Sequence, residues 1–247
     1  MILYFTYNDQ PSGVYWSQVT DVVAHMNTLG GDRVRLFAFV SARDFVRTRR
    51  EIKQRLPDAI VWPMVPRMQR WKSNLPLLAA IVRLYKPVGI ICRGVMTTWM
   101  AQRLRDRGLV KKVCFDARGA YAAEWEEYRI IDDDALIAQF RGLENDAVNK
   151  SDFRLAVSHA LVEHWRERYG YPGSEAGAGA GDAHVVIPCT LGQDFEKPVA
   201  GMIDRFRNDV GHSPDDVLLV YSGSTAGWQS FTLLEELLVN IMSAQAN

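Results

Sequence analysis

Cysteine is scarce in this sequence, and histidine never occurs in a ligand spacing. Cys92, Cys114 and Cys189 are an odd number at wide intervals, and the first two lie in apolar runs typical of strands. We expect buried, reduced thiols rather than disulfides or a metal centre. The five histidines form no His-x-x-x-His pair or similar pattern. We therefore expect no metal ion and no other cofactor.

Long apolar runs are absent as well. No stretch of 18 apolar residues occurs, so no membrane-spanning helix is predicted. Residues 1–6 lack a charged leader region and a cleavage site, and they predict a first strand rather than a signal peptide. These features favour a cytoplasmic protein.

Three further motifs are missing, and each absence disfavours a class of protein. No Gly-x-Gly-x-x-Gly follows the first predicted strand, which disfavours a dinucleotide-dependent oxidoreductase. No Gly-x-Ser-x-Gly is present, which disfavours an α/β-hydrolase. No nucleic-acid-binding motif is recognisable, so we expect no nucleic-acid partner.

The charge of the chain is zero in total but unevenly distributed. Residues 1–112 hold 19 Lys+Arg against 7 Asp+Glu, and residues 113–247 hold 10 against 22. Such a split bears on which partners the protein binds and not on its fold. We hypothesise that the basic half meets an anionic membrane surface or a phosphate-bearing acceptor; the alternative is an ordinary solvated helix face. The basic residues that prompt this are Arg43, Arg47, Arg49, Arg50, Lys53, Arg55, Arg67, Arg70 and Lys72.

Hydrophobic periodicity predicts an α/β fold. The chain has 247 residues, 48% of them apolar and 23% charged, as in an ordinary globular protein. Short apolar runs alternate with helical patterns, which is typical of a doubly wound parallel sheet of the Rossmann-like kind. Strands are predicted at 2–6, 34–40, 59–64, 88–92, 113–115, 153–157 and 185–187. Helices are predicted at 14–29, 43–56, 74–86, 96–107, 121–149 with a break near 132–134, and 159–169. Trp62, Trp99, Trp125 and Trp165 are expected in the core or between helices.

The last part of the chain begins a second α/β unit. A helical stretch at 199–210 precedes an apolar run at 217–221, a loop of small residues at 222–228 and a helix at 230–242. One strand and one helix cannot close a sheet. We therefore expect either a piece of a longer protein or a unit that packs onto the first domain.

Polar residues follow the strand predicted at 113–115. Asp116, Arg118 and Gly119 come directly after it, and Glu124 lies in the following helix. In open α/β sheets, ligands bind outside the carboxyl ends of the strands. These residues are therefore placed to meet a polar ligand. The alternative is that Asp116 caps the next helix and Arg118 pairs with it.

The order of several such motifs resembles nucleotide-sugar glycosyltransferases of the GT-B fold, in particular glycosyltransferase family 4. The motifs are Pro11-Ser12-Gly13 after the first strand, Cys92-Arg93-Gly94 after the fourth, Phe115-Asp116-Ala117-Arg118-Gly119 with Glu124, Val157-Ser158 before a helix, Val186-Ile187-Pro188 with Asp194-Phe195, and Tyr221-Ser222-Gly223-Ser224 with Trp228. The sequence departs from the family where Pro188-Cys189-Thr190 lacks the common Asn-Gly. The loop at 222–229 also lacks the usual Arg and Lys, and no Glu-x₇-Glu donor motif follows.

The resemblance implies an arrangement of domains and a set of roles. Residues 1–190 would form the acceptor-binding Rossmann-like domain, 191–216 the linker and 217–247 the incomplete start of the donor-binding domain. The enzyme would be a retaining hexosyl-type transferase in polysaccharide biosynthesis. It would use a nucleotide sugar as co-substrate and a glycan or lipid-linked acceptor, and the present chain would be inactive alone. The implied catalytic residues are Arg118, Asp116 and Glu124, the cleft residues Ser12, Gly13, Arg93, Gly119 and Ser158, and the donor-binding residues Gly223, Ser224 and Trp228.

A second hypothesis of another class stands beside the enzymatic one. The chain would then be a non-catalytic module that binds sugars or lipid phosphates, or one subunit of a split glycosyltransferase.

Overall fold

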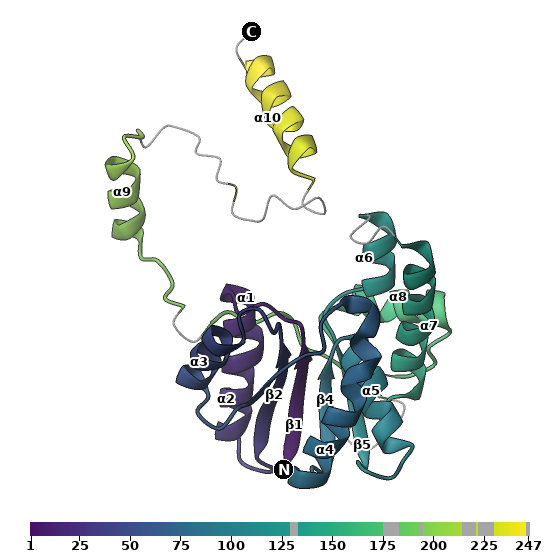
Figure 1. Ribbon diagram of the computed structural model, residues 1–247. Coiled ribbons are helices and arrows are strands. Elements are labelled where there is room, and N and C mark those ends of the chain that lie inside the picture. The colour runs from purple at the N-terminus through teal and green to yellow at the C-terminus, as the bar shows by residue number, and fades with distance from the viewer. Residues whose placement is uncertain (129–132, 175–182, 193–194, 214–220, 222–229, 246–247) are drawn as a thin grey trace.

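A seven-stranded parallel sheet forms the centre of the computed structural model, which describes residues 1–128, 133–174, 183–192, 195–213, 221 and 230–245 (Figure 1). The strand order is β3-β2-β1-β4-β5-β6-β7. The strands are β1 (Ile2–Tyr7), β2 (Val34–Val40), β3 (Ile60–Pro63), β4 (Gly89–Arg93), β5 (Lys112–Ala117), β6 (Phe153–Ala156) and β7 (His184–Val186). This confirms the doubly wound, Rossmann-like fold.

Helices cover the sheet on both faces. After β3 the chain returns to the middle of the sheet, where β4 is added on the free side of β1. The helices are α1 (Gly13–Tyr15), the π-helical η1 (Trp16–Thr20), α2 (Asp21–Thr28), α3 (Phe45–Arg55), the 3₁₀ helix η2 (Met68–Asn74), α4 (Leu75–Tyr85), α5 (Val95–Arg105), α6 (Tyr121–Glu127), α7 (Asp134–Lys150) and α8 (His159–Tyr169). Right-handed crossovers place α2 and α3 on one face and α4, α5, α7 and α8 on the other. None of the helices in these ranges combines the length and apolarity needed to cross a membrane.

Alternating side chains of the central strands divide the core into two clusters. Leu3 and Phe5 of β1 pack toward α4, α5, α7 and α8. Tyr4 points to the opposite side and belongs to the cluster with α2 and α3. This alternation follows from the two-residue period of a strand. In the described part of the chain the crossovers after β3 all lie on the other side, so the α2–α3 face of β4 to β7 is covered less than the opposite face.

Two predicted helices differ in detail from the structure. The helix predicted at 14–29 is continuous but widens into the π-helical turn η1. The helix predicted at 121–149 is divided into α6 and α7, as expected, and Asp133 caps α7 because its carboxylate accepts the Leu136 N–H at 3.0 Å. The sequence did not predict η2, the short helix that carries the buried Trp71.

The prediction for the tryptophans is wrong in one case. Trp165 is fully buried, and Trp125 packs against Phe140 with ring centroids 4.1 Å apart. Trp62, however, is 45% exposed on β3. Trp62 lies on the edge strand β3, where it lines a hollow with Phe45 of α3 and Tyr85 of α4 and is covered on one side only.

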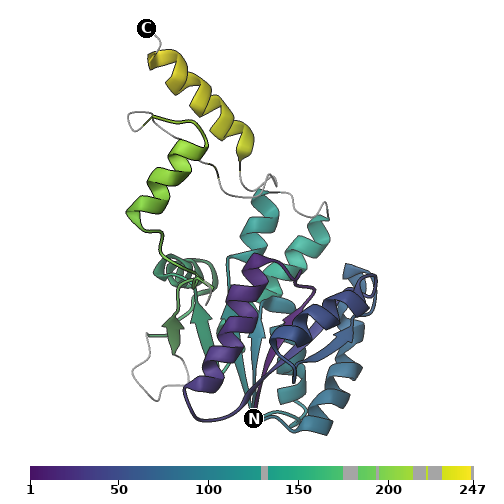
Figure 2. The ribbon, with the colours of Figure 1, turned by 90° about the vertical axis from the view of Figure 1, so that its left-hand side faces the viewer.

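Beyond β7 the structure describes two further helices, α9 (Ala200–Asp209) and α10 (Phe231–Gln245). Both lie where helices were predicted, and both stand away from the layered domain in the two views (Figures 1 and 2). The strand predicted at 217–221 falls almost wholly outside the described residues. The division into domains at 190 and 216 therefore stays a prediction.

Asp152 ties the amino ends of β5 and β6 together. Its carboxylate accepts the Val113 N–H at 2.9 Å and hydrogen bonds from Arg105 and Lys112, both at 3.0 Å. Burial raises the pKa of this carboxyl, but these three donors outweigh it, so the pKa is lowered. A lowered pKa means that the ionised form stabilises the folded state.

We predict that Asp152→Asn lowers the free energy of unfolding at pH 7 by about 1–3 kcal/mol, as for other hydrogen bonds to charged groups. The stabilisation is present above the ordinary pKa of about 4 and is lost as the pH falls through the lower folded value. Urea unfolding from pH 7 to pH 3 should show the two proteins converging in acid. Asp32→Asn, which removes an exposed pair with the N-terminus, serves as a control with a change below about 1 kcal/mol. A constant difference across the pH range would contradict the prediction.

Candidate functional site

The candidate site lies where the strand order reverses. β1 pairs with β2 on one side and with β4 on the other. β2 and β3 therefore extend the sheet in one direction from β1, and β4 and the later strands extend it in the other. Asp9 follows β1, Arg93 ends β4, and Asp116 lies beside Arg93 in the register of β4 and β5. Crevices at such switch points are where open α/β sheets bind ligands.

Asp116 is the buried centre of this site. Its side chain is 1% exposed, and it accepts a hydrogen bond from the Tyr4 hydroxyl at 2.5 Å and one from Arg118 Nη2 at 3.1 Å. Arg118 Nε lies 2.9 Å from the other carboxylate oxygen. Burial and the neighbouring Asp116 charge raise the pKa of Tyr4, which stays a hydroxyl donor. The Asp116–Arg118 pairing considered from the sequence is therefore present, but Asp116 lies within β5 and does not cap α6.

Arg118 also connects distant parts of the chain. Its Nη1 donates to Gln18 Oε1 at 3.3 Å, and Gln18 lies in the π-helical turn η1. The Gln18 amide nitrogen donates in turn to the carbonyl oxygen of Thr190, after β7, and lies 3.4 Å from the Thr190 hydroxyl. One guanidinium thus joins β5, the first helix and the segment after the last strand. π-Turns inside α-helices are often found at functional sites.

Arg93 and Asp9 form a second pair beside the first. Arg93 Nε lies 3.3 Å from Asp9 Oδ2, and the Arg93 side chain is only 12% exposed. Its Nη1 is buried and has no hydrogen-bond partner among the described residues. Burial raises the pKa of Asp9 to about 6, although Arg93 beside it lowers that pKa. The pair therefore offers a guanidinium donor and a carboxylate able to exchange a proton near neutral pH.

Gly119 and Glu124 are brought together by the turn into α6. A Cβ on Gly119 would lie 2.2 Å from Glu124 Oε1, so only glycine leaves room for this carboxylate. Burial raises the pKa of Glu124, opposed by the Ala120 N–H. The carboxylate that holds α6 is Glu144 of α7, which accepts the N–H groups of Tyr121 and Ala122, each at 3.1 Å.

The other predicted site residues have plainer surroundings. Ser12 precedes α1 without a capping hydrogen bond, and a Cβ on Gly13 would meet no atom within 4 Å. The Ser158 hydroxyl accepts the Leu161 N–H at 3.2 Å and so caps α8. Gly223, Ser224 and Trp228 lie outside the described residues. Their proposed roles stay predictions.

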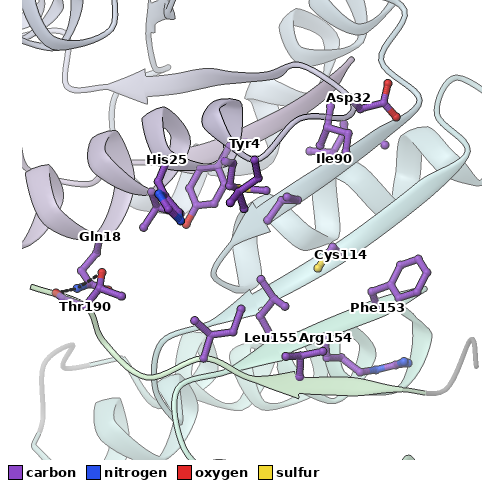
Figure 3. A pocket seen from close by; sticks show the side chains of 18 of the residues that line it. Tyr4, Gln18, His25, Asp32, Ile90, Cys114, Phe153, Arg154, Leu155 and Thr190 are labelled. Carbon is purple, nitrogen blue, oxygen red and sulfur yellow. Dashed lines mark hydrogen bonds between the residues drawn. The ribbon is translucent and has the colours of Figure 1, made fainter. Parts of the chain in front are cut away.

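A wide apolar hollow of about 1060 Å³ borders the site (Figure 3). It lies over the α2–α3 face of β4 to β7, with Ile91, Cys114 and Leu155 on its floor and His25 of α2 on its wall. Tyr4, Gln18 and Arg118 also line it, so the hollow meets the polar site at these three residues. Within the described ranges, no three His, Cys, Asp or Glu side chains gather as metal ligands would.

Three residues of the site are not among those that the sequence predicted. Asp9 follows a strand just as Asp116 does in the sequence, and the same rule could have found it. Tyr4 and Gln18 carried no such signal, because each resembles an ordinary core residue until the fold brings it to a partner 112 or 100 positions away.

Comparison with solved structures shows which proteins share this fold. HepE of Anabaena, crystallised with UDP, matches with a TM-score of 0.56 and 12% identity over 85% of this chain and 50% of its own. Sucrose-phosphate synthase of Thermosynechococcus elongatus matches with 0.54 and 14% over 87% and 53%. A glycosyltransferase of Rickettsia africae matches with 0.53 and 15% over 87% and 50%. The chain spans about half the length of these proteins. No family model and no curated protein sequence matches it.

We predict that Tyr4→Phe lowers the free energy of unfolding by about 1.5–3 kcal/mol, because Asp116 loses a buried donor to its charge. Tyr128→Phe removes the same hydroxyl from an exposed ring and should change stability by less than about 0.5 kcal/mol. Chemical unfolding at neutral pH measures both. Equal effects of the two substitutions would show that the Tyr4 hydroxyl contributes nothing specific.

We predict that Gly119→Ala displaces the Glu124 carboxylate toward solvent and brings its raised pKa back toward the ordinary value. The fold should persist, since the atom in conflict is the end of a flexible side chain. NMR titration of the Glu124 carboxyl carbon measures the shift. Gly142→Ala, where an added Cβ meets no atom within 4 Å, is the control. An unchanged Glu124 pKa in Gly119→Ala would contradict the proposed close contact.

Proposed function

We propose that this chain is the acceptor-binding half of a GT-B glycosyltransferase that transfers a sugar from a nucleotide-sugar donor. One observation carries the proposal: two largely buried guanidinium groups, Arg93 and Arg118, lie at the switch point of a fold shared with a glycosyltransferase and with a UDP-bound protein. Guanidinium groups suit phosphate oxygens, and negative charge grows on the leaving diphosphate during glycosyl transfer.

The two arginines would have different roles. Arg118 is held by Asp116 and Gln18, so it presents a fixed positive charge. Arg93 keeps a buried Nη1 with no partner in the described structure, which is suited to an oxygen of a bound ligand. Fixed donors stabilise developing charge without reorganising during the reaction. Asp116 would then position Arg118 and not itself act as a base.

A proton acceptor for the acceptor hydroxyl is available at the same place. Asp9, with a pKa of about 6, pairs with Arg93, and Glu124, with a raised pKa, lies against Gly119 in the turn that follows Arg118. A base with a pKa close to the working pH is the most effective. The resemblance implied Glu124 as a catalytic residue, and we add Asp9 as a candidate for the proton acceptor.

The remaining parts of the proposal rest on the resemblance in sequence. Gly223, Ser224 and Trp228 would contact the donor diphosphate, and Ser12, Gly13 and Ser158 would line the acceptor side. The donor would be a UDP-, GDP- or ADP-linked sugar, and no metal ion would be required. The acceptor would be a glycan or lipid-linked sugar, used with retention of configuration in the cytoplasm at the inner face of the membrane.

We predict that phosphate-bearing acceptor analogues, such as polyprenyl phosphates, raise the melting temperature of this chain, because ligands that bind only the folded state stabilise it. A hundredfold excess over Kd stabilises by about 2.7 kcal/mol. Arg93→Gln should abolish the shift, which is measured from the melting temperature of each protein without ligand because the substitution also removes the partner of Asp9. Arg83→Gln, at an exposed position, is the matched control.

The same thermal-unfolding experiment includes UDP-, GDP- and ADP-linked sugars. Stabilisation by lipid phosphates without nucleotide sugars is the result expected for an acceptor half. Stabilisation by a nucleotide sugar would place a donor site within this chain and overturn the division of roles. A shift that survives in Arg93→Gln as it does in Arg83→Gln would remove Arg93 from the site.

A further inference from the structure

One face of α3 presents a row of basic side chains to solvent. Val46, Arg49, Arg50 and Lys53 stand at positions i, i+3, i+4 and i+7, so they share a face of the helix. The opposite face, with Ile52, is buried against the sheet. The four residues line a common shallow hollow of about 440 Å³. We call them, together with Arg35 and Trp62 described below, the α3 basic surface.

The charge of this surface is not compensated locally. Arg49 and Arg50 make no ion pair with any described residue, and Lys53 donates to the Pro57 carbonyl oxygen at 3.1 Å. Of the acids on or next to α3, Glu51 already pairs with Arg47 at 2.8 Å. Unpaired cations side by side repel one another, which favours a partner that supplies many negative charges at once.

Aromatic residues extend the surface onto the edge of the sheet. A second hollow of about 440 Å³ joins Arg49 and Lys53 of α3 to Arg35, Trp62 and Tyr85. Trp62 is 45% exposed and Val46 69% exposed among these cations. An exposed tryptophan beside basic residues is typical of surfaces that lie at the headgroup level of a membrane.

Two further arginines next to α3 and η2 add to the positive charge. Arg43 precedes α3 and Arg67 precedes η2, and both are exposed at the carboxyl ends of the neighbouring parallel strands β2 and β3. This is also the edge of the sheet that holds Arg93 and Arg118. Arg43 and Arg67 therefore continue the positive charge from α3 to the edge of the sheet where the candidate site lies.

We propose that the α3 basic surface binds anionic lipid membranes, with Arg49, Arg50 and Lys53 at the lipid phosphates and Trp62 and Val46 at the headgroup boundary. The bilayer would then lie beside the carboxyl edge of the sheet. An acceptor anchored in that bilayer reaches the site without leaving the membrane surface. Membrane binding itself does not depend on the proposed glycosyltransferase activity.

Co-sedimentation of the 247-residue chain with vesicles tests the proposal. The vesicles are phosphatidylcholine alone or phosphatidylcholine with 30% phosphatidylglycerol, at 50 and 300 mM NaCl. We expect binding to the anionic vesicles only, weakened by salt, since screening shortens the reach of surface charges. The variant Arg49→Gln/Arg50→Gln/Lys53→Gln should bind about 100-fold more weakly, roughly fivefold for each charge.

A matched triple variant tests whether the position of the removed charges matters or only their number. Arg83→Gln/Arg107→Gln/Lys111→Gln removes the same charge from exposed positions near the opposite edge of the sheet and should keep the binding of the parent within about twofold. Trp62→Ala should weaken binding at both salt concentrations, because its contribution is apolar. Equal binding to neutral vesicles, or equal losses in the two triple variants, would overturn the proposal. Thermal unfolding of each variant confirms that it is folded.

Discussion

The site depends on the placement of a carboxylate inside a parallel sheet. Asp116 is buried in β5, where an uncompensated charge would be strongly destabilising. Arg118 and Tyr4 compensate it, and this requirement fixes the position of the arginine. Arg118 in turn holds Gln18, and Gln18 holds Thr190. The charge in the sheet thus determines how the first helix and the segment after the last strand lie against each other.

The sequence predicted the parts of this arrangement that follow from local pattern. Buried strands and their following polar residues are visible in sequence, so Asp116, Arg118 and Arg93 could be placed at one edge of the sheet. The partners could not, because Tyr4 and Gln18 meet them across a hundred residues or more. Trp62 shows the converse: an aromatic residue in a strand predicts a core position, but on the edge strand β3 this ring stays 45% exposed. The donor-side residues lie beyond the described structure and remain predictions.

Fold and charge contribute separate parts of the functional argument. The fold is shared with a glycosyltransferase and with sucrose-phosphate synthase at 14–15% identity, which establishes architecture and not activity. Arg93 and Arg118, each beside a carboxylate, are the observation from which we propose phosphate binding. The uneven distribution of charge bears on the α3 basic surface, which lies wholly in the basic half of the chain. The site draws Asp9 and Arg93 from that half and Asp116 and Arg118 from the acidic half, and each of its two arginines lies beside a carboxylate.

One side of the site depends on Glu144, a residue of the distant helix α7. The seven residues of α6 are too few to form a stable helix alone, and their first N–H groups are satisfied by a carboxylate of α7, more than 20 residues further along the chain. The position of Glu124 against Gly119 therefore depends on the packing of α7 against α5 and α6. Release of α7 would change this side of the site while Tyr4, Arg93 and Asp116 keep their places on the central strands.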